Sequence, residues 1–532
     1  MGTLLTRGVL PVIVLLVGWL TNPLMVRADW AVGSLRSIND VLGHVRYLAK
    51  LAGKEDLVQQ LEPIVKPFLE RGIDPKRPLG FAVRQFNLEN PPVLLFIPVT
   101  SERDFVDLLA GFNLVVAEAK EGIRELPLPD GKKLYLRFAH GYAFGAEAVT
   151  TLAGTLPNPP VDLPKENLQN LVALTVRVDQ IPSASKQFLF GQLDREMSKD
   201  LGRQRGESEA QHLGRTTVIN LIRAQVRAFL LETQAMSLVA NLDEARHKVV
   251  LELRVEPVPG SSLSRQVAAW DQSRSLFVTA VKEAAAYLLV NLSLAPELRQ
   301  NLNAVLDKSF QEELDKLEGV VKKAVAEKVY RTLEPTLKQE TLDAAVMLMG
   351  PRNQRYALVG ALQVRDGKRL EGLLRDLVKE MPEADRQKIA LDHQRVGNVS
   401  LHRLELPPLD EEGARLFGSN EAYVAILDQA IFVGLGEQGA EAVQAVLIQA
   451  GGGSGQPAPV LDLRVAVSRL AWLSKDDAER LAAAAKKAFS GPGEDTVHLE
   501  LRGGEVLRLR LEASSLLVKL AVMLSPLDED GR

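Results

Sequence analysis

The chain has 532 residues, of which 46% are hydrophobic and 25% charged, a balance typical of a globular protein with a sizeable core. Its formal net charge is −4 and no basic stripe runs along it, which argues against nucleic acid and against an anionic membrane as partners. The absence of cysteine excludes disulfides, thiol catalysis and zinc–thiolate sites.

The first thirty residues have the layout of a secretory signal peptide. Arg7 gives a short positive start, residues 8–20 are mostly apolar, and Val26-Arg27-Ala28 precedes the expected cleavage after residue 28. The alternative is a retained anchor, but the apolar run of about 13 residues is shorter than the roughly 20 that a membrane-spanning helix needs. We expect export to the periplasm or beyond. Removing two arginines and no acid changes the net charge from −4 to −6.

The first half of the remaining chain alternates strand and helix patterns. Strands are expected at 78–84 and 93–99, followed by a helix at 105–110. A strand that turns into a helix follows at 142–149, then a strand at 172–178. A hairpin at 236–242 and 249–255, turning across 243–246, closes this half. Helical inserts are expected at 59–70 and 204–233.

The second half repeats this succession. Strands at 343–349 and 356–364 precede a helix at 369–379, a strand at 430–434 with a helix from 438, and a strand at 461–467. Residues 497–501 and 507–511 alternate apolar and polar side chains around Gly503-Gly504, which predicts a hairpin with a two-residue loop. A long helical insert at 296–333 begins with Pro296, a residue favoured in the first helical turn.

Because both halves run through the same elements, we expect an α+β fold of two tandem divergent repeats, each an antiparallel sheet with helices on one side. The predicted organisation is a signal peptide at 1–28, a first repeat at 29–260, a second repeat at 261–525 with the insert 296–333, and a tail at 526–532. The boundary lies near Pro257-Val-Pro-Gly-Ser-Ser262, and Gly451–Pro457 is predicted to be a flexible loop inside the second repeat.

Four stretches carry a resemblance: Pro78–Val99, Val249–Gly260, Glu411–Gly418 and Val506–Glu512. In them the chain resembles a group of uncharacterised exported proteins of planctomycete bacteria. The similarity covers most of the chain after the signal segment, but it consists of core strands and turns. It implies export and this architecture, and it implies no activity and no site residues.

One motif could bind a nucleotide. Gly434, Gly436 and Gly439 form a G-x-G-x-x-G pattern between an apolar strand and a helix, as in dinucleotide sites. The corresponding place in the first half, Phe144-Gly145-Ala146-Glu147, turns with a single glycine, and no βαβ unit begins at the motif. We therefore expect a plain strand-to-helix turn and no cofactor.

The titratable residues do not form a recognisable catalytic or metal-binding pattern. No two histidines lie within eight residues of each other, so we expect single histidines at the surface or at strand edges; the alternative is a metal site built from residues distant in sequence. The seven are His44, His140, His212, His247, His393, His402 and His498. The acidic runs Asp410–Glu412, Asp476-Asp477 and Asp528–Asp530 are expected to cap helices or to face solvent. Ser185-Lys186 and Ser198-Lys199 are expected to lie in helices without catalytic meaning.

These patterns leave three functional alternatives. The first is an exported, non-catalytic protein acting in binding or in envelope structure, with an envelope protein as a possible partner. The second is a periplasmic carrier or chaperone for apolar ligands, because a curved sheet under helices can enclose an apolar cavity. The third is a hydrolase whose site the sequence does not reveal. A broad exposed apolar patch over a filled core would favour the first alternative.

Overall fold

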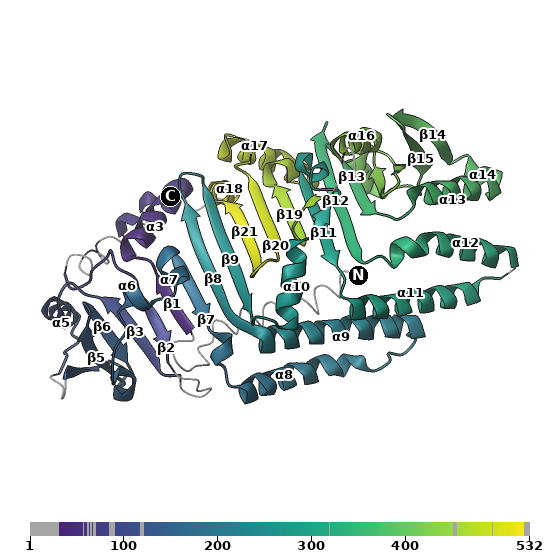
Figure 1. Cartoon of the computed structure of the whole chain (residues 1–532). Helices are drawn as coiled ribbons and strands as arrows, with labels where there is room; N and C mark the ends of the chain where they lie inside the picture. The colour runs from purple at the N-terminus through teal and green to yellow at the C-terminus, as the bar shows by residue number, and fades with distance from the viewer. Residues whose placement is uncertain are drawn as a thin grey trace. The chain divides into compact units, whose positions relative to one another are not determined.

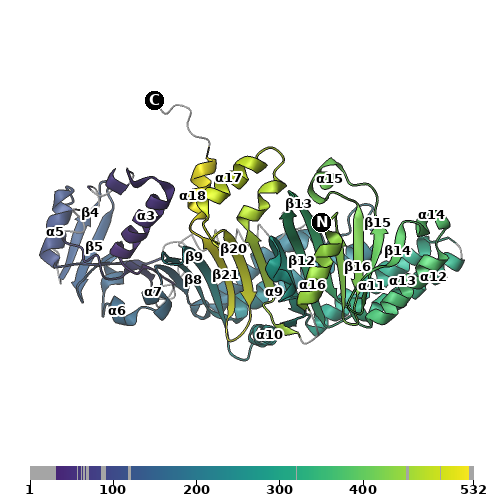
Figure 2. The same cartoon turned by 90° about the horizontal axis from the view of Figure 1, so that it is seen from above.

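The computed structural model describes residues 31–525, with gaps at 57, 61–62, 64–65, 67–70, 85–90, 118–121, 319, 451–454 and 492 (Figures 1 and 2). The expected signal peptide, the tail and Asp528–Asp530 lie outside these residues. The chain divides into two compact units, one of residues up to Gln187 with Thr233–Leu242, the other of Phe188–Glu232 with the chain from Asp243 onward. The repeat boundary near Pro257 stays a prediction, because these units are defined by packing and not by internal similarity.

The first unit contains an antiparallel sheet of eight strands. Their spatial order is β4-β5-β6-β3-β2-β1-β7-β8, so the expected pair at 78–84 and 93–99 is confirmed as β2 and β3. The strands are β1 (Ala31–Leu35), β2 (Leu79–Val83), β3 (Val93–Pro98), β4 (Ile123–Pro127), β5 (Lys133–Ala139), β6 (Tyr142–Ala146), β7 (Val172–Val176) and β8 (Thr233–Asp243).

Short helices cover the first unit's sheet, and two of them begin at well-formed caps. Ser37 and Ser101 accept hydrogen bonds from the backbone N–H three residues on, at the starts of α3 (Ile38–Ala52) and α5 (Glu102–Gly111). On one face Phe96, Tyr142 and Phe144 form a buried cluster with Leu152 of η3, and on the other face α5 buries Phe105. Helical segments therefore lie on both faces, and the expectation of helices on one side only is wrong for this unit. The remaining helical segments are η3 (Val149–Leu152), α6 (Pro159–Asp162), α7 (Lys165–Gln169), η4 (Val178–Gln180) and the start of α8 (Ser183–Ser198).

The second unit contains a larger antiparallel sheet. Its spatial order is β9-β21-β20-β19-β11-β12-β13-β17-β16-β15-β14, and several of these neighbours can be followed in Figure 1. The strands are β9 (Lys248–Pro257), β11 (Ala286–Ser293), β12 (Thr341–Arg352), β13 (Arg355–Gln363), β14 (Ile389–Val396), β15 (Val399–Glu405), β16 (Glu421–Ile426), β17 (Ala430–Leu435), β19 (Leu461–Ala466), β20 (Thr496–Arg502) and β21 (Leu507–Ser514); β10 (Arg274–Ser275) and β18 (Gln456–Pro457) form a separate ribbon.

Helices lie on both faces of the second unit's sheet, so the expectation of helices on one side only is wrong here. The buried cluster on one face includes Val443 and Val446 of α16 (Gly439–Ala450), whereas Glu371 of α13 (Gly367–Glu380) approaches His402 from the other face. The remaining helical segments are η5 (Lys199–Leu201), α9 (Glu209–Glu232), α10 (Ser262–Asp271), η6 (Ala280–Glu283), α11 (Pro296–Lys316), α12 (Val320–Leu337), α14 (Glu383–Arg386), α15 (Glu411–Phe417), η7 (Val467–Leu473), α17 (Ala478–Ala488) and α18 (Leu517–Leu524).

Two local expectations for this unit need correction. The helix expected at 296–333 is two helices, α11 and α12, with α11 ending at Lys316 and Leu317 as its C-cap. The hairpin of β20 and β21 is confirmed, but pairing stops at Arg502↔Arg508, so Gly503-Gly504 is not a two-residue loop. Close packing explains the glycine at position 503, because a Cβ there would lie 2.1 Å from the Val267 carbonyl oxygen of α10.

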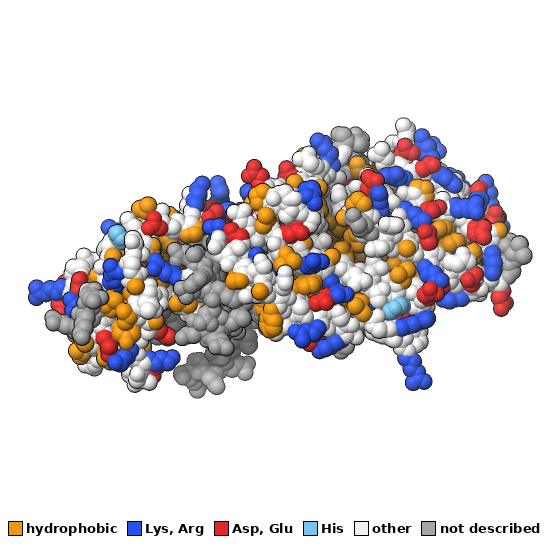
Figure 3. Space-filling model, turned by 60° about the horizontal axis from the view of Figure 1, so that its bottom comes forward, with side chains coloured by type: hydrophobic (Ala, Val, Ile, Leu, Met, Phe, Trp, Pro, Cys, Tyr) orange, Lys and Arg blue, Asp and Glu red, His pale blue; other side chains and the backbone are white. Residues whose placement is uncertain are grey.

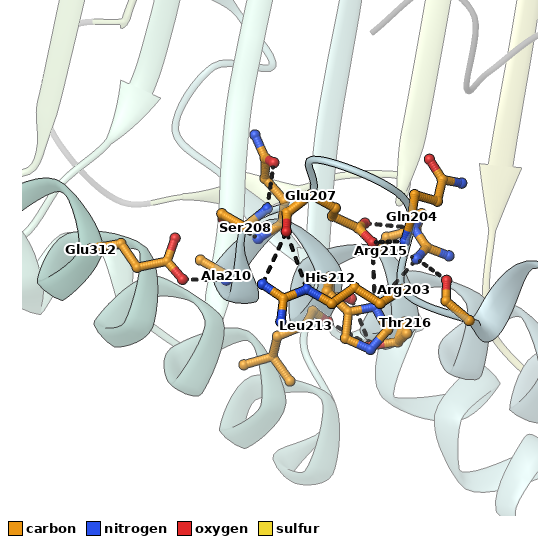
Figure 4. A network of polar contacts seen from close by, with 12 residues as sticks. Arg203, Gln204, Glu207, Ser208, Ala210, His212, Leu213, Arg215, Thr216 and Glu312 are labelled. Atoms are coloured by element: carbon orange, nitrogen blue, oxygen red, sulfur yellow. Dashed lines mark hydrogen bonds and ion pairs between the residues drawn. The ribbon is translucent and has the colours of Figure 1, made fainter.

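A polar network fixes the start of α9 (Figure 4). Arg215 donates to both carboxylate oxygens of Glu207 at 2.8 Å, and the backbone N–H of Gln204 donates to the same carboxylate at 2.9 Å. These bonds, Arg215 first, lower the pKa of Glu207 to about 2. Glu312 of α11 accepts from the backbone N–H of Ala210 at 2.7 Å, which joins α9 to α11. These polar groups form hydrogen bonds and ion pairs with one another, so we assign the network a structural role.

Candidate functional site

The two faces of the second unit's sheet differ in how completely they are covered. On one face, here called the core face, Met347, Val359 and Phe432 are 0–1% exposed beneath α16 and the segment around Phe277. Phe277 and Phe432 meet edge to face with ring centroids 5.7 Å apart. This side of β11, β12, β13 and β17 is a filled core.

The opposite face, here called the aliphatic face, carries three cross-strand rows over nine strands from β9 to β16. Directly paired residues point to the same side of a sheet, so each row is a line of neighbouring side chains. The rows are Leu251, Leu511, Leu499, Leu463, Leu288, Val346, Gly360, Val433, Val424; then Leu253, Leu509, Leu501, Leu461, Val290, Ala344, Leu362, Ile431, Ile426; then Val249, Ala513, Val497, Val465, Ala286, Leu348, Leu358, Leu435, Ala422.

The aliphatic face is not buried. Among the residues of the three rows only Ala422 is buried, and a Cβ built at Gly360, between Val346 and Val433, meets nothing within 4 Å. Side chains 37–48% exposed on this face are Leu251, Leu288, Leu342, Val346, Leu362 and Val433. Hydrophobic side chains also reach the surface between charged ones on the side shown in Figure 3. Exposed apolar patches larger than roughly a few hundred Å² mark interaction sites in soluble proteins.

Over β9, β21 and β20 the side opposite the aliphatic face is charged. Glu252, although 6% exposed, pairs with Arg510 at 3.3 Å, and Arg510 pairs in turn with Glu512 at 3.2 Å. Such a sheet is amphipathic: one face is satisfied by ion pairs and water, and the other needs an apolar cover.

The glycine motif is explained by close packing. A Cβ at Gly434 would lie 2.5 Å from both the Gly439 carbonyl oxygen and Val443 Cγ2, and Gly436 has φ +105°. The turn's amides are already bonded, since Gly436 N donates to Glu421 O, Glu437 N to Phe417 O, and Gly439 N to Gly436 O, at 2.8–3.0 Å. Amides engaged in this way do not cradle a pyrophosphate.

One cluster of possible metal ligands was missed by the sequence reasoning. Glu371, Asp392 and His402 place carboxylate and imidazole atoms within 4.8 Å of one another, and His402 is 0% exposed, which corrects the expectation of surface histidines. Arg375 donates to both oxygens of Asp392 at 2.7 Å and to Glu371 at 2.6 Å. This arginine holds the pKa of Asp392 far below its usual range.

The tautomer of His402 does not fit a metal. The backbone N–H of Asp392 donates to His402 Nδ1 at 3.0 Å, so the neutral ring carries its proton on Nε2, which has no hydrogen-bond partner. A metal-bound histidine needs the reverse, a free lone pair on the ligating nitrogen and a proton on the other. Burial, together with Arg375, lowers the pKa of His402 and keeps the ring neutral. The cluster is therefore an ion-pair network around a neutral histidine.

His498 lies on the polar face of β20, as the alternation of its strand predicts. Its Nε2 is 2.8 Å from Asp462 Oδ1, and the hydroxyl of Tyr287 donates to the same oxygen at 3.1 Å. The hydrogen bond to Asp462 raises the pKa of His498. None of the contacts described for this group brings in a nucleophile, so the geometry gives an acid–base pair without a substrate-attacking group.

The remaining candidates have local roles. Asp410 caps α15 by accepting from Gly413 N at 2.7 Å, as expected, and Ser474 accepts from Asp477 N at 3.2 Å just before α17. Other histidines are placed on α3 (His44), beside turns with positive φ (His140, His247), on α9 (His212) and on β14 (His393). Ser185, Lys186 and Ser198 lie in α8, as expected, while Lys199 begins η5.

Comparison with protein-family models, with curated proteins and with solved structures returned no match. No helix in the described part of the chain is both long and apolar enough to cross a lipid bilayer.

Proposed function

We propose that this chain is an exported, non-catalytic binding protein whose binding surface is the aliphatic face of the second unit. The observation that carries the proposal is the set of apolar rows that remain partly exposed opposite a filled core and a charged surface. Covering a leucine or valine side chain that is 37–48% exposed recovers roughly 0.5–1 kcal/mol, so an apolar occupant spanning several rows gains affinity from this surface alone.

Export is part of this proposal. The n-region, apolar stretch and cleavage site of residues 1–28 support translocation out of the cytoplasm, and the lack of cysteine is compatible with an oxidising compartment. The mature protein is proposed to act in the periplasm or outside the cell.

A carrier of apolar ligands is the second candidate, and the composition of the rows favours it. Protein partners are usually recognised with hydrogen bonds and aromatic anchors at the centre of the interface. The three rows contain only Leu, Ile, Val, Ala and Gly, a surface that suits an alkyl chain without any polar contact.

We also propose that the two units derive from one duplicated unit. In the first sheet β1 lies between β2 and β7, and in the second sheet β11 lies between β12 and β19. The order β2-β1-β7-β8 of the first unit thus corresponds to β12-β11-β19-β20 of the second. In the same way β3-β6-β5 corresponds to β13-β17-β16. These matching orders support the duplication. Superposition of the two strand sets is its test, and unrelated strand directions would contradict it.

The binding proposal is tested by titration with a neutral apolar fluorophore such as Nile red. The triple variant Leu288→Ser, Val346→Ser, Val433→Ser removes apolar surface from three neighbouring strands without touching the core face. The matched control is Val161→Ser, Ile448→Ser, since these two side chains are 72% exposed but lie off the aliphatic face. Binding that the triple variant weakens at least tenfold, and the control leaves unchanged, supports the proposal; equal binding by all three proteins contradicts it.

A further inference from the structure

A pocket of about 580 Å³ lies on the other side of the second unit's sheet, where β19 passes into η7 and packs beside α17 and the start of β20. Four cationic side chains line it, those of Lys282, Arg464, Arg469 and Lys486, together with a single carboxylate, that of Asp495. The rest of the wall includes small or apolar side chains, among them Ala482, Ala485 and Phe489.

Two of these charged groups are already used by the fold. Arg469 donates to the carbonyl oxygens of Gly350 and Glu283, and burial lowers the pKa of its guanidinium. Asp495 is 7% exposed and accepts from both the backbone N–H and the hydroxyl of Ser468. Both groups therefore have a structural role in holding this part of the pocket wall.

The three other cations have no ionic partner. Among the residues that the structure describes, no carboxylate lies within 4.0 Å of the charged atoms of Lys282, Arg464 or Lys486. Glu494, which could have served, instead accepts from the backbone N–H groups of Ser490 and Gly491 at 2.6 and 3.0 Å.

Several like charges around one concave site raise the local potential and attract counter-ions. The cost of holding the cations together falls when an anion enters, and charge-assisted hydrogen bonds then form to lysine and arginine. A volume of about 580 Å³ falls within the range of small-molecule sites, roughly 300–1,000 Å³, and exceeds what a bare phosphate fills. The apolar wall at Ala482, Ala485 and Phe489 suits the body of an organic anion.

We propose that this pocket binds a small organic anion, a phosphate monoester or a carboxylate, with Lys282, Arg464 and Lys486 contacting the charged group and the α17 wall contacting its carbon skeleton. The site is separate from the aliphatic face, because Arg464 points to the opposite side of β19 from Leu463 and Val465.

The test uses the full mature chain and glycerol 3-phosphate, titrated by calorimetry at low ionic strength. Arg464→Gln removes the arginine, Lys486→Gln changes an exposed residue of α17, and Lys487→Gln is the matched control one position along, outside the pocket lining. We expect Arg464→Gln and Lys486→Gln each to weaken binding by about tenfold, and the control by less than twofold.

A second binding experiment distinguishes a phosphate group on a membrane from one in solution. Vesicles of neutral lipid with 20% phosphatidate present the phosphate on a membrane, whereas glycerol 3-phosphate presents it in solution. Binding of either probe that depends on Arg464 and Lys486 but not on Lys487 supports the site. Absence of binding to both probes at millimolar concentration, or an equal loss in all three variants, would overturn the proposal.

Discussion

The strand-to-helix turn at residues 434–439 permits a quantitative test of the packing argument. At Gly436 a Cβ would meet the Phe417 carbonyl oxygen at 2.9 Å, and φ is +105°. A non-glycine residue in such a conformation costs on the order of 1–3 kcal/mol. At Gly434 the added Cβ would lie 2.5 Å from backbone and from Val443 Cγ2, and overpacking of this kind costs roughly 1–3 kcal/mol.

Gly360 is the matched control, because it is also a strand glycine but a Cβ there meets nothing within 4 Å. Gly360→Ala should leave stability unchanged or raise it by about 0.5 kcal/mol, since alanine restricts the unfolded chain. Gly434→Ala and Gly436→Ala should each lower the free energy of unfolding of the second unit by about 2 kcal/mol.

The assay is urea unfolding followed by circular dichroism, comparing midpoints among the three variants and the wild type, with calorimetric titration of NAD and ATP alongside. The reasoning is refuted if Gly436→Ala unfolds at the same midpoint as Gly360→Ala. Micromolar nucleotide binding that Gly436→Ala abolishes in a folded protein would instead establish a phosphate-binding loop.

Four further outcomes follow from single residues. In the first unit Asn167 is 0% exposed and bonds to β1 and β7, so Asn167→Ala should cost about 3 kcal/mol in denaturant unfolding, and a cost under about 1 kcal/mol would contradict the network. The hydrogen bond to Asp462 raises the pKa of His498. The protonated imidazole therefore stabilises the folded protein below the ordinary pKa of histidine, and this contribution is lost as pH rises through the raised pKa. His498→Gln should lower Tm more at pH 6 than at pH 9. Burial raises the pKa of Asp343, so ionisation of this carboxyl destabilises the folded protein increasingly as pH rises. The Tm of Asp343→Asn minus the Tm of the wild type should therefore increase from pH 4 to pH 8. N-terminal sequencing of the protein from a secreting bacterial host should start within two residues of Asp29, whereas an intact Met1 on cytoplasmic protein would contradict export.

Strands with strict alternation were predictable from the sequence, because their period matches the pleat. The hairpin around residues 497–511 is an example, and its leucines do share one face.

Other features depend on tertiary pairing and had no local signal. His402 and Glu371 meet although 31 positions separate them, because β15 and α13 pack together, and no spacing rule reports such a contact. The cationic pocket likewise combines η6, β19 and α17. Alternation indicated which residues share a face, but it could not indicate that the aliphatic face stays partly exposed, since an uncovered apolar face has the same sequence pattern as a buried one.

The aliphatic face is proposed to be an accessible binding surface. This proposal is tested most directly by labelling the mature protein with an apolar diazirine that inserts into exposed side chains on illumination, followed by peptide mass spectrometry. The account predicts strong labelling of β11, β12 and β17, around Leu288, Val346 and Val433, and protection of those peptides by saturating Nile red. Labelling confined to residues off this face, such as Ile448 on α16, with β11, β12 and β17 unlabelled, would contradict it.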